Sequence, residues 1–255
     1  MPDQGRRRLL SPSALVCLLV VLSVHGDVTG QSQTVQTSGP STRLAEMQHH
    51  FLQVTQVHEA VIRGDLAAVA KPALELSRMP MPEGLPMEGG PFLAAIRRAG
   101  ARAAVSPNLR STTAATVTML QQCAGCHRIA GVYPAPPSPK RQDVGGVVGH
   151  MLEHQRAADA LLLGLIVPSE AQWKDGAERL ATSVLHSSDW PPDRALTLEI
   201  RKAEVAVHAL ADRAARARSS DARAAVYADL LTTCASCHSL RARLWGPEDQ
   251  RPASR

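Results

Sequence analysis

The stretch TTAATVTMLQQCAGCH, residues 112–127, ends in a cysteine motif that the chain uses twice. CAGCH at 123–127 returns 111 residues later as CASCH at 234–238. In both places the motif follows a run without Gly or Pro in which Ala and Leu recur, a composition that favours helix. We therefore expect each motif to lie at the C-terminal end of a helix, from about 112 in the first case and over about 220–240 in the second.

The composition of the whole chain favours an all-α protein. Aromatic residues make up 3% of the 255 residues, and long runs of β-branched or aromatic residues that would indicate a sheet are few. Alanine and leucine are abundant, with Arg, Glu and Gln between them. The length leaves room for one large or two small domains.

The sequence also repeats outside the cysteine motifs. At an offset of 104 residues, four separate positions of the first part of the chain match the second part, which indicates a duplication. The matches pair Met47 and His50 with Met151 and His154, Asp65 with Ser169, Leu76 with Leu180, and Ile96–Ala99 with Ile200–Ala203. The offset then grows by seven residues before the cysteine motif, so the second copy has the longer connection there.

Each copy is predicted to contain four helices. Apolar residues fall on one helical face in the first of them, and Asp65 and Ser169 are candidate N-caps of the second. Pro72 and Gly176 fall at matching positions inside the second helices, where a kink or a close approach is expected. The expected helices span about 44–61, 65–78, 92–105 and 112–127, then 147–166, 169–186, 193–218 and 220–240.

These patterns predict two tandem four-helix bundles, each with CxxCH at the end of its last helix. The bundles would occupy 41–130 and 144–245, joined by a Pro-rich linker at 131–143 and followed by a mobile tail at 246–255.

The first residues have the order of an export signal. A basic start at Arg6–Arg8 precedes a mostly apolar stretch at 9–24, and small residues follow, so residues 1–30 are predicted to be a signal peptide. The alternative is an uncleaved N-terminal anchor, for which the apolar run is short. Cys17 lies inside this run and is interpreted as a small apolar residue. The expected location is periplasmic or otherwise exported, with no stable membrane insertion after cleavage.

The net charge and the cysteines outside the predicted signal also bear on the function. Three of the arginines behind the formal charge of +5 lie in the predicted signal, and no dense basic stripe is present, so nucleic-acid binding is not supported. Of the five cysteines, the four outside the signal all belong to the CxxCH motifs.

CxxCH is the attachment motif of c-type haem. The two thiols, one helical turn apart, form thioethers with the haem, and the histidine binds the iron from the proximal side. The prediction is two covalently bound haem c groups, on Cys123 and Cys126 and on Cys234 and Cys237, with His127 and His238 as proximal ligands. Alternatives for a CxxC pair are a redox dithiol, half of a zinc site or, taking both pairs, one Cys₄ zinc site.

The ligand on the other side of each iron is less directly indicated. His50 and His154 recur in register on the apolar face of a first helix, and they are the favoured distal ligands. Met47 and Met151, three residues earlier on the same face, are the alternative, and an open iron is the third possibility. The histidines without a counterpart in the other copy are interpreted as surface or packing residues: His49, His58, His150, His186 and His208.

With CxxCH on the last helix and the distal candidates on the first, each copy resembles the cytochrome c′ and cytochrome c556 family of four-helix bundles. The resemblance implies the distal placement of His50 and His154, and it implies that a homodimer could form, since relatives often pair through their first helices. Arg128 and Arg241 follow the haem histidines, as a basic residue does in the family. The histidine offered on the distal side departs from the family's usual Met or apolar residue.

The expected function is therefore an exported dihaem cytochrome that carries single electrons between other redox proteins. The alternative is cytochrome c′-like binding or sensing of NO or CO at an open haem iron. A dihaem peroxidase is disfavoured, because that chemistry needs polar acid and base groups beside an open iron, and the distal helices show mainly Val, Leu and Ala around one histidine.

Overall fold

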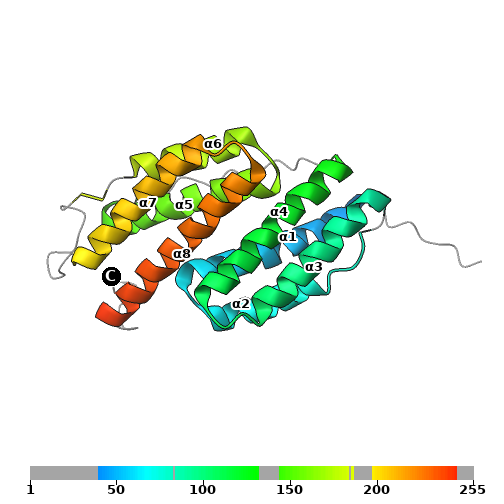
Figure 1. Cartoon of the computed structure of the whole chain (residues 1–255), viewed down its shortest axis with the longest axis horizontal. Helices are drawn as coiled ribbons and strands as arrows, with labels where there is room; N and C mark the ends of the chain where they lie inside the picture. The colour runs from blue at the N-terminus through cyan, green and yellow to red at the C-terminus, as the bar shows by residue number, and fades with distance from the viewer. Residues whose placement is uncertain (1–39, 83, 132–143, 184, 187–196, 246–255) are drawn as a thin grey trace, which may run out of the picture. The chain divides into compact units, whose positions relative to one another are not determined.

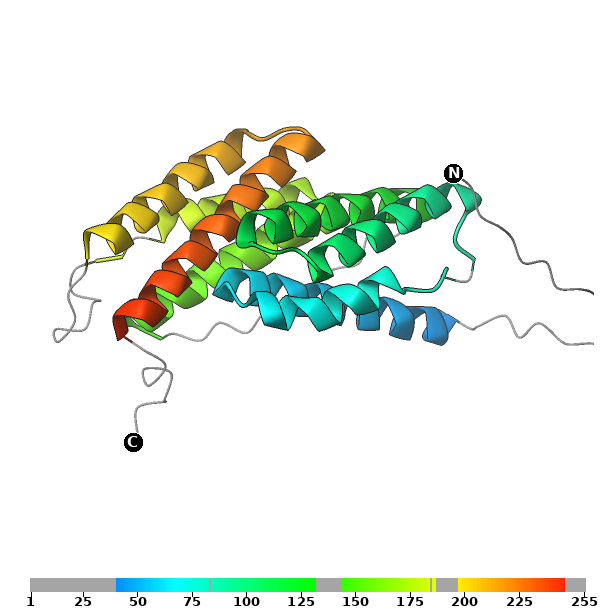
Figure 2. The ribbon, with the colours of Figure 1, turned by 60° about the horizontal axis from the view of Figure 1, so that its bottom comes forward.

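The structure is a computed structural model that describes residues 40–82, 84–131, 144–183, 185–186 and 197–245. These residues form α-helices and connecting turns, and no strand occurs among them. They all belong to one compact unit, Thr37–Arg255 (Figures 1 and 2). The prediction of an all-α protein is confirmed.

The described residues of the first half form four α-helices and one short 3₁₀ turn. The third helix begins two residues before its predicted start, and η1 directly precedes it. The elements are α1 (Pro40–Arg63), α2 (Leu66–Ser77), η1 (Met87–Gly89), α3 (Gly90–Ala104) and α4 (Leu109–Ala130).

The described residues of the second half form four more helices, close to the predicted ranges. The second of them ends earlier than expected, and the last runs beyond its predicted end. They are α5 (Gly146–Ile166), α6 (Glu170–Thr182), α7 (Leu198–Arg216) and α8 (Ser220–Trp245).

Both predicted N-caps are confirmed. The side chain of Asp65 accepts a hydrogen bond from the Ala68 backbone N–H at 3.0 Å, and the Ser169 hydroxyl accepts one from the Gln172 N–H at 3.3 Å. Each satisfies a backbone donor that the first helical turn cannot satisfy itself.

The matched positions inside the second helices behave differently. A methyl group placed on Gly176 would come within 2.8 Å of the Ala157 carbonyl oxygen on α5, so the predicted close approach is confirmed there. At Pro72, α2 continues through the proline, whose side chain is buried. The glycine thus allows the backbone of α6 to come close to the backbone of α5.

Consecutive helices pack against one another in both halves: α1 on α2, α2 on α3, and α3 on α4, then α5 on α6, α6 on α7, and α7 on α8. Trp173 of α6 is fully buried, and its indole N–H donates to the Ala214 carbonyl of α7 at 2.9 Å. The Arg223 guanidinium of α8 lies 5.2 Å from the Trp173 ring centre, which ties three helices together at one point.

The two halves also pack against each other along four helices. Helix α4 contacts α8 and α5, and α1 contacts α8 more extensively than it contacts α4 of its own half (Figure 2). Gln121 of α4 donates to the Asp221 carboxylate of α8 at 2.9 Å. The first helix of each half therefore lies along the last helix of the other half.

Other predictions fall outside the described residues. These are the signal peptide at 1–30, most of the linker at 131–143 and the tail at 246–255. The division into two tandem bundles at 41–130 and 144–245 stays a prediction. Across the described helices, none is both long and apolar enough to cross a membrane.

Candidate functional site

The first cysteine motif lies in the last two turns of α4. The Cys123 side chain packs partly buried against the hydrophobic core, and Cys126, one turn later, is half-buried. Burial and the neighbouring Cys126 raise the pKa of the Cys123 thiol to about 12, and burial also raises the pKa of Cys126. Both sulfurs are free and are held as neutral thiols.

The histidine of this motif is oriented by the other half of the molecule. Its Nδ1 lies 2.8 Å from the Ile166 carbonyl oxygen at the end of α5. With Nδ1 donating to this carbonyl, His127 presents Nε2 as its free donor atom. Burial lowers the pKa of His127, although the hydrogen bond to Ile166 opposes that shift, so the ring is neutral near pH 7.

The second motif lies in the middle of the long helix α8. Cys234 packs against the core, and burial together with Cys237 raises its pKa to about 12. Burial raises the pKa of Cys237, and the Glu204 carboxylate of α7 adds to that shift. Like the first pair, these are free thiols in a half-buried setting.

The second motif also meets the first helix of the opposite half. A methyl group on Gly64, at the end of α1, would come within 2.9 Å of the Ser239 hydroxyl and 3.3 Å of the Ala235 carbonyl. Burial, Arg241 and Arg63 lower the pKa of His238. Each motif histidine is thus neutral and lies beside the last turn of the other half's first helix.

The alternatives for the CxxC pairs find little support in this geometry. A redox dithiol uses a cysteine whose pKa is lowered, whereas all four thiols here have raised values. In the part of the chain that the structure describes, one group of three His, Cys, Asp or Glu side chains brings its donor atoms within 4.8 Å, and it contains no cysteine.

On α1, the distal candidates of the first copy are half-buried. The His50 ring lies 6.3 Å from that of His49, centre to centre, and burial and His49 lower its pKa. Its Nδ1 is buried and has no hydrogen-bond partner among the described residues. A neutral imidazole with an unpaired nitrogen is what an iron ligand requires, and Met47 lies one turn earlier on the same helix.

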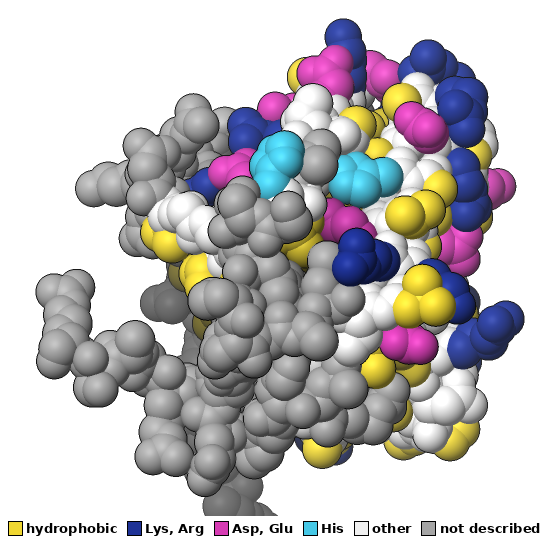
Figure 3. Space-filling model, turned by 90° about the vertical axis from the view of Figure 1, so that its left-hand side faces the viewer, with side chains coloured by type: hydrophobic (Ala, Val, Ile, Leu, Met, Phe, Trp, Pro, Cys, Tyr) yellow, Lys and Arg dark blue, Asp and Glu magenta, His cyan; other side chains and the backbone are white. Residues whose placement is uncertain are grey.

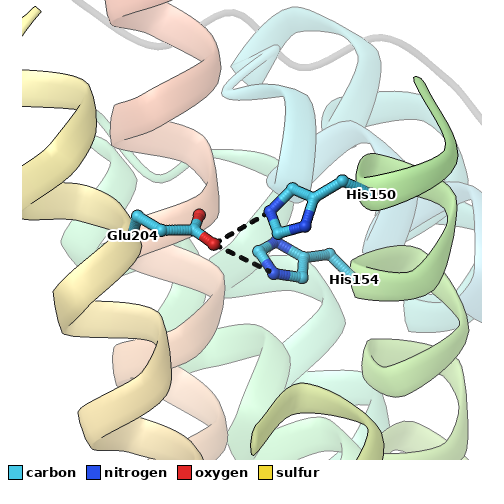
Figure 4. A group of neighbouring side chains, drawn as sticks. All are labelled: His150, His154 and Glu204. Atoms are coloured by element: carbon cyan, nitrogen blue, oxygen red, sulfur yellow. Dashed lines mark ion pairs between the residues drawn. The ribbon is translucent and has the colours of Figure 1, made fainter. Parts of the chain in front are cut away.

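On α5, the distal candidate His154 belongs to a cluster (Figure 4). The rings of His150 and His154 lie 4.1 Å apart, and both point toward the Glu204 carboxylate of α7. From Glu204 Oε1 the distance is 2.9 Å to His150 Nε2 and 3.9 Å to His154 Nε2. His208, one turn after Glu204 on α7, places its Nε2 3.3 Å from the same oxygen.

The cluster has defined charge states. Burial and the neighbouring His150 lower the pKa of His154 to about 4, so this ring is neutral at pH 7. Burial alone would raise the pKa of Glu204, but its contacts with His150, His154 and His208 outweigh that effect and lower it. The cluster therefore combines an ionised carboxylate with a neutral imidazole.

Sequence reasoning missed three members of this cluster. His150 and His208 were interpreted as surface or packing residues, and Glu204 was not considered. The matching residues of the first half are Glu46, Ala104 and Gly100, which form no such cluster. The repeat pattern therefore did not indicate the three residues of the second half. The signal that could have found them is spacing: His150 and His154, and likewise Glu204 and His208, are four residues apart on one helical face.

A second buried polar group lies between the halves. The Tyr227 hydroxyl of α8 lies 2.6 Å from His58 Nε2 of α1 and donates to the Ala158 carbonyl of α5 at 3.2 Å. Both side chains are fully buried, and burial lowers the pKa of His58 to about 4. His58 is a packing residue, as expected, but it packs against the opposite half.

Comparisons of the chain with protein-family models, with curated proteins and with solved structures give no match.

Proposed function

We propose that this chain is an exported c-type cytochrome with two covalently bound haem c groups, which passes single electrons between other redox proteins. Cys123 and Cys126 hold one haem, and Cys234 and Cys237 hold the other. His127 and His238 are the proximal iron ligands. Each haem, when bound, supplies a one-electron iron couple.

The observation that carries the proposal is the bond between His127 Nδ1 and the Ile166 carbonyl, at 2.8 Å. Iron-binding histidines commonly donate their second ring nitrogen to a carbonyl or carboxylate, which fixes the ring and directs the other nitrogen to the metal. A histidine beside a redox dithiol has no need of this arrangement, and the one group of three metal-binding side chains that the described residues form contains no cysteine, as a zinc site on CxxC would. The neutral, half-buried thiols one turn apart support the same assignment, since thioether formation uses both sulfurs on one side of a helix.

The rest of the chain provides the apolar and rigid surroundings that electron transfer at a haem requires. The cores on which Cys123 and Cys234 pack exclude water from the attachment side, and low polarity there helps to set the potential. We include in the proposal two tandem four-helix bundles, one for each haem. The contacts of α1 with α8 and of α4 with α5 support a fixed arrangement of the two sites.

On the distal side the proposal keeps two candidates for each iron. They are His50 or Met47 for the first haem and His154 or Met151 for the second. His50 is supported by its buried Nδ1 and His154 by its buried Nε2, neither of which has a hydrogen-bond partner among the described residues. Ligation by two histidines gives a lower potential than ligation by histidine and methionine.

Binding or sensing of NO or CO at an open iron is the second candidate function. It is favoured in the second half, where Glu204 lies 3.9 Å from His154 Nε2 and could keep His154 away from the iron. The cluster around Glu204 also supplies acid and base groups on α7, which packs against the helix of the second motif, and the sequence did not lead us to expect them. We still propose an electron carrier rather than an enzyme, because the first half offers no such set.

Absorption and electron paramagnetic resonance spectra of the purified mature chain test the proposal. We expect low-spin ferric spectra and a ferrous spectrum that carbon monoxide leaves unchanged. A high-spin ferric signal with prompt carbon monoxide binding supports the second candidate function instead. Replacing His50 by Ala should turn one haem high-spin and leave the other unchanged.

The remaining parts of the proposal concern the protein's surroundings. Export to the periplasm or beyond follows from the signal-like residues 1–30, and partners are expected to be other redox proteins. A homodimer is part of the proposal through the family resemblance alone. Sedimentation equilibrium of the mature chain distinguishes the monomer from the dimer.

A further inference from the structure

Two helices of the second half direct three metal-binding side chains to one point. His150 and His154 lie four residues apart on one face of α5, and Glu204 faces them from α7 (Figure 4). Their donor atoms all lie within 4.8 Å of one another. Four ligands at about 2.0 Å around a tetrahedral ion are separated by about 3.3 Å, and the 2.9 and 3.9 Å distances to Glu204 Oε1 bracket that value.

The two nitrogens that face Glu204 make ion-pair contacts with its carboxylate but no well-directed hydrogen bond. His150 Nε2 and His154 Nε2 are both buried and lack a hydrogen-bond partner of acceptable geometry among the described residues. The 2.9 Å separation of His150 Nε2 from Glu204 is close, but its direction is not that of a ring N–H donating to oxygen. The His150 side chain is only 4% exposed, so water does not readily satisfy it. Buried unpaired nitrogens are costly unless something binds them.

Ser183 holds both rings from behind. Its hydroxyl lies 3.2 Å from His150 Nδ1, and its backbone makes a hydrogen bond with the His154 ring. Such contacts on the far nitrogen fix the ring and leave Nε2 to a metal, as partners of metal-binding histidines do. On the other side, His208 contacts the carboxylate of Glu204 and holds it in place.

We propose that His150, His154 and Glu204 bind one divalent transition-metal ion, and that Zn²⁺ is the ion this site takes. Two neutral imidazoles and a carboxylate form a ligand set that Zn²⁺ binds with a fourth position left to water. Oxygen-preferring ions such as Mg²⁺ and Ca²⁺ suit a site with two nitrogens poorly. The first half has Glu46, His50 and Gly100 at the matching positions and forms no such site.

The site can be reached from solvent. The side chains of Glu204 and His208 are 19% and 28% exposed. An ion can therefore enter past the α7 side of the cluster. Figure 3 shows one face of the molecule, on which histidine side chains lie at the surface.

This site goes beyond the proposed electron transfer and needs only α5, α7 and Ser183. Helix α7, which carries Glu204, packs against α8, which carries the second motif. A zinc-bound His154 could not bind the second haem, which leaves Met151 or an open iron. That last consequence rests on the proposed function, whereas zinc binding itself does not.

Equilibrium dialysis of the full mature chain, with its haems, against Zn²⁺ tests the proposal, with bound zinc and iron measured by elemental analysis. We expect one Zn²⁺ per chain. Ser183→Ala should weaken binding by about 10- to 100-fold, and Glu204→Gln by at least as much. Glu46→Gln, at the first-half position that matches His150, should bind as the parent does. Circular dichroism confirms that each variant keeps its helices.

X-ray absorption at the zinc edge of the parent protein needs no variant. Nitrogen and oxygen neighbours at about 2.0 Å are expected. Sulfur neighbours, no bound zinc, or equal binding by Glu204→Gln would each overturn the zinc site. Iron content separates the two proposals: haem without zinc removes only this inference, and nitrogen-bound zinc without haem removes only the cytochrome.

Discussion

The buried histidine between the halves should make stability depend on pH in a way that one substitution removes. His58 is fully buried, and its neighbours from the facing helices are Tyr227, at 2.6 Å, and Asp159, whose Oδ1 lies 3.8 Å from Nδ1. Its pKa falls from 6.5 to about 4 because burial disfavours the charged ring. The unfolded chain, with its ordinary pKa, therefore takes up this proton first.

The sign and size of the effect follow from that difference. Above pH 6.5 both states are neutral at His58 and the full stability is present. As the pH falls from 6.5 to about 4, protonation favours the unfolded state, and stability is lost. A shift of this size corresponds to about 3 kcal/mol. The Asp159 carboxylate would favour the charged ring, so this value is an upper bound.

His58→Leu isolates this contribution, since the matching residue of the second half is the buried Leu162. The free energy of unfolding, from urea titrations followed by circular dichroism, is compared for parent and variant between pH 7.5 and 4. The parent should lose up to about 3 kcal/mol more than the variant. If the free energies of unfolding of the two proteins change with pH in parallel, His58 does not cause the loss, whatever the difference between them at neutral pH.

Three further substitutions test the packing, each read as the free energy of unfolding in urea. Gly176→Ala should cost about 1–3 kcal/mol, because the new methyl group meets the Ala157 carbonyl at 2.8 Å, and an unchanged value would contradict the close approach. Asp65→Ala should cost about 1 kcal/mol through loss of the N-cap, and Asp65→Asn much less. Trp173→Phe should cost about 2–3 kcal/mol by removing volume and the bond to Ala214, and a loss below 1 kcal/mol would show that neither matters.

The helices could be predicted from the sequence because their signals are local. Capping side chains, Gly and Pro breaks and apolar spacing decide where a helix begins and ends, and Asp65 and Ser169 both cap as expected. The packing of α1 on α8 could not be predicted in this way. It depends on which apolar faces meet across a hundred residues or more, and a repeat pattern suggests only that each copy packs within itself.

The same difference between local and long-range signals decides which parts of the candidate sites could be predicted. The cysteine motifs are contiguous, so their residues could be found from the sequence alone. The bond from His127 to Ile166 could not, because it joins α4 to the end of α5. The cluster around His154 was missed because His150 and Glu204 have no equivalent residues in the first copy, and only the fold brings α7 to α5.

Intact-mass spectrometry of the mature chain, isolated from a host that attaches c-type haem, tests haem attachment itself. We expect the mass of the polypeptide plus two haems, with no free thiol open to alkylation. Two double variants should each retain one haem. One combines Cys123→Ala with Cys126→Ala, and the other combines Cys234→Ala with Cys237→Ala. A chain that carries no haem and four alkylatable cysteines, under conditions in which a known c-type cytochrome matures normally, would contradict it.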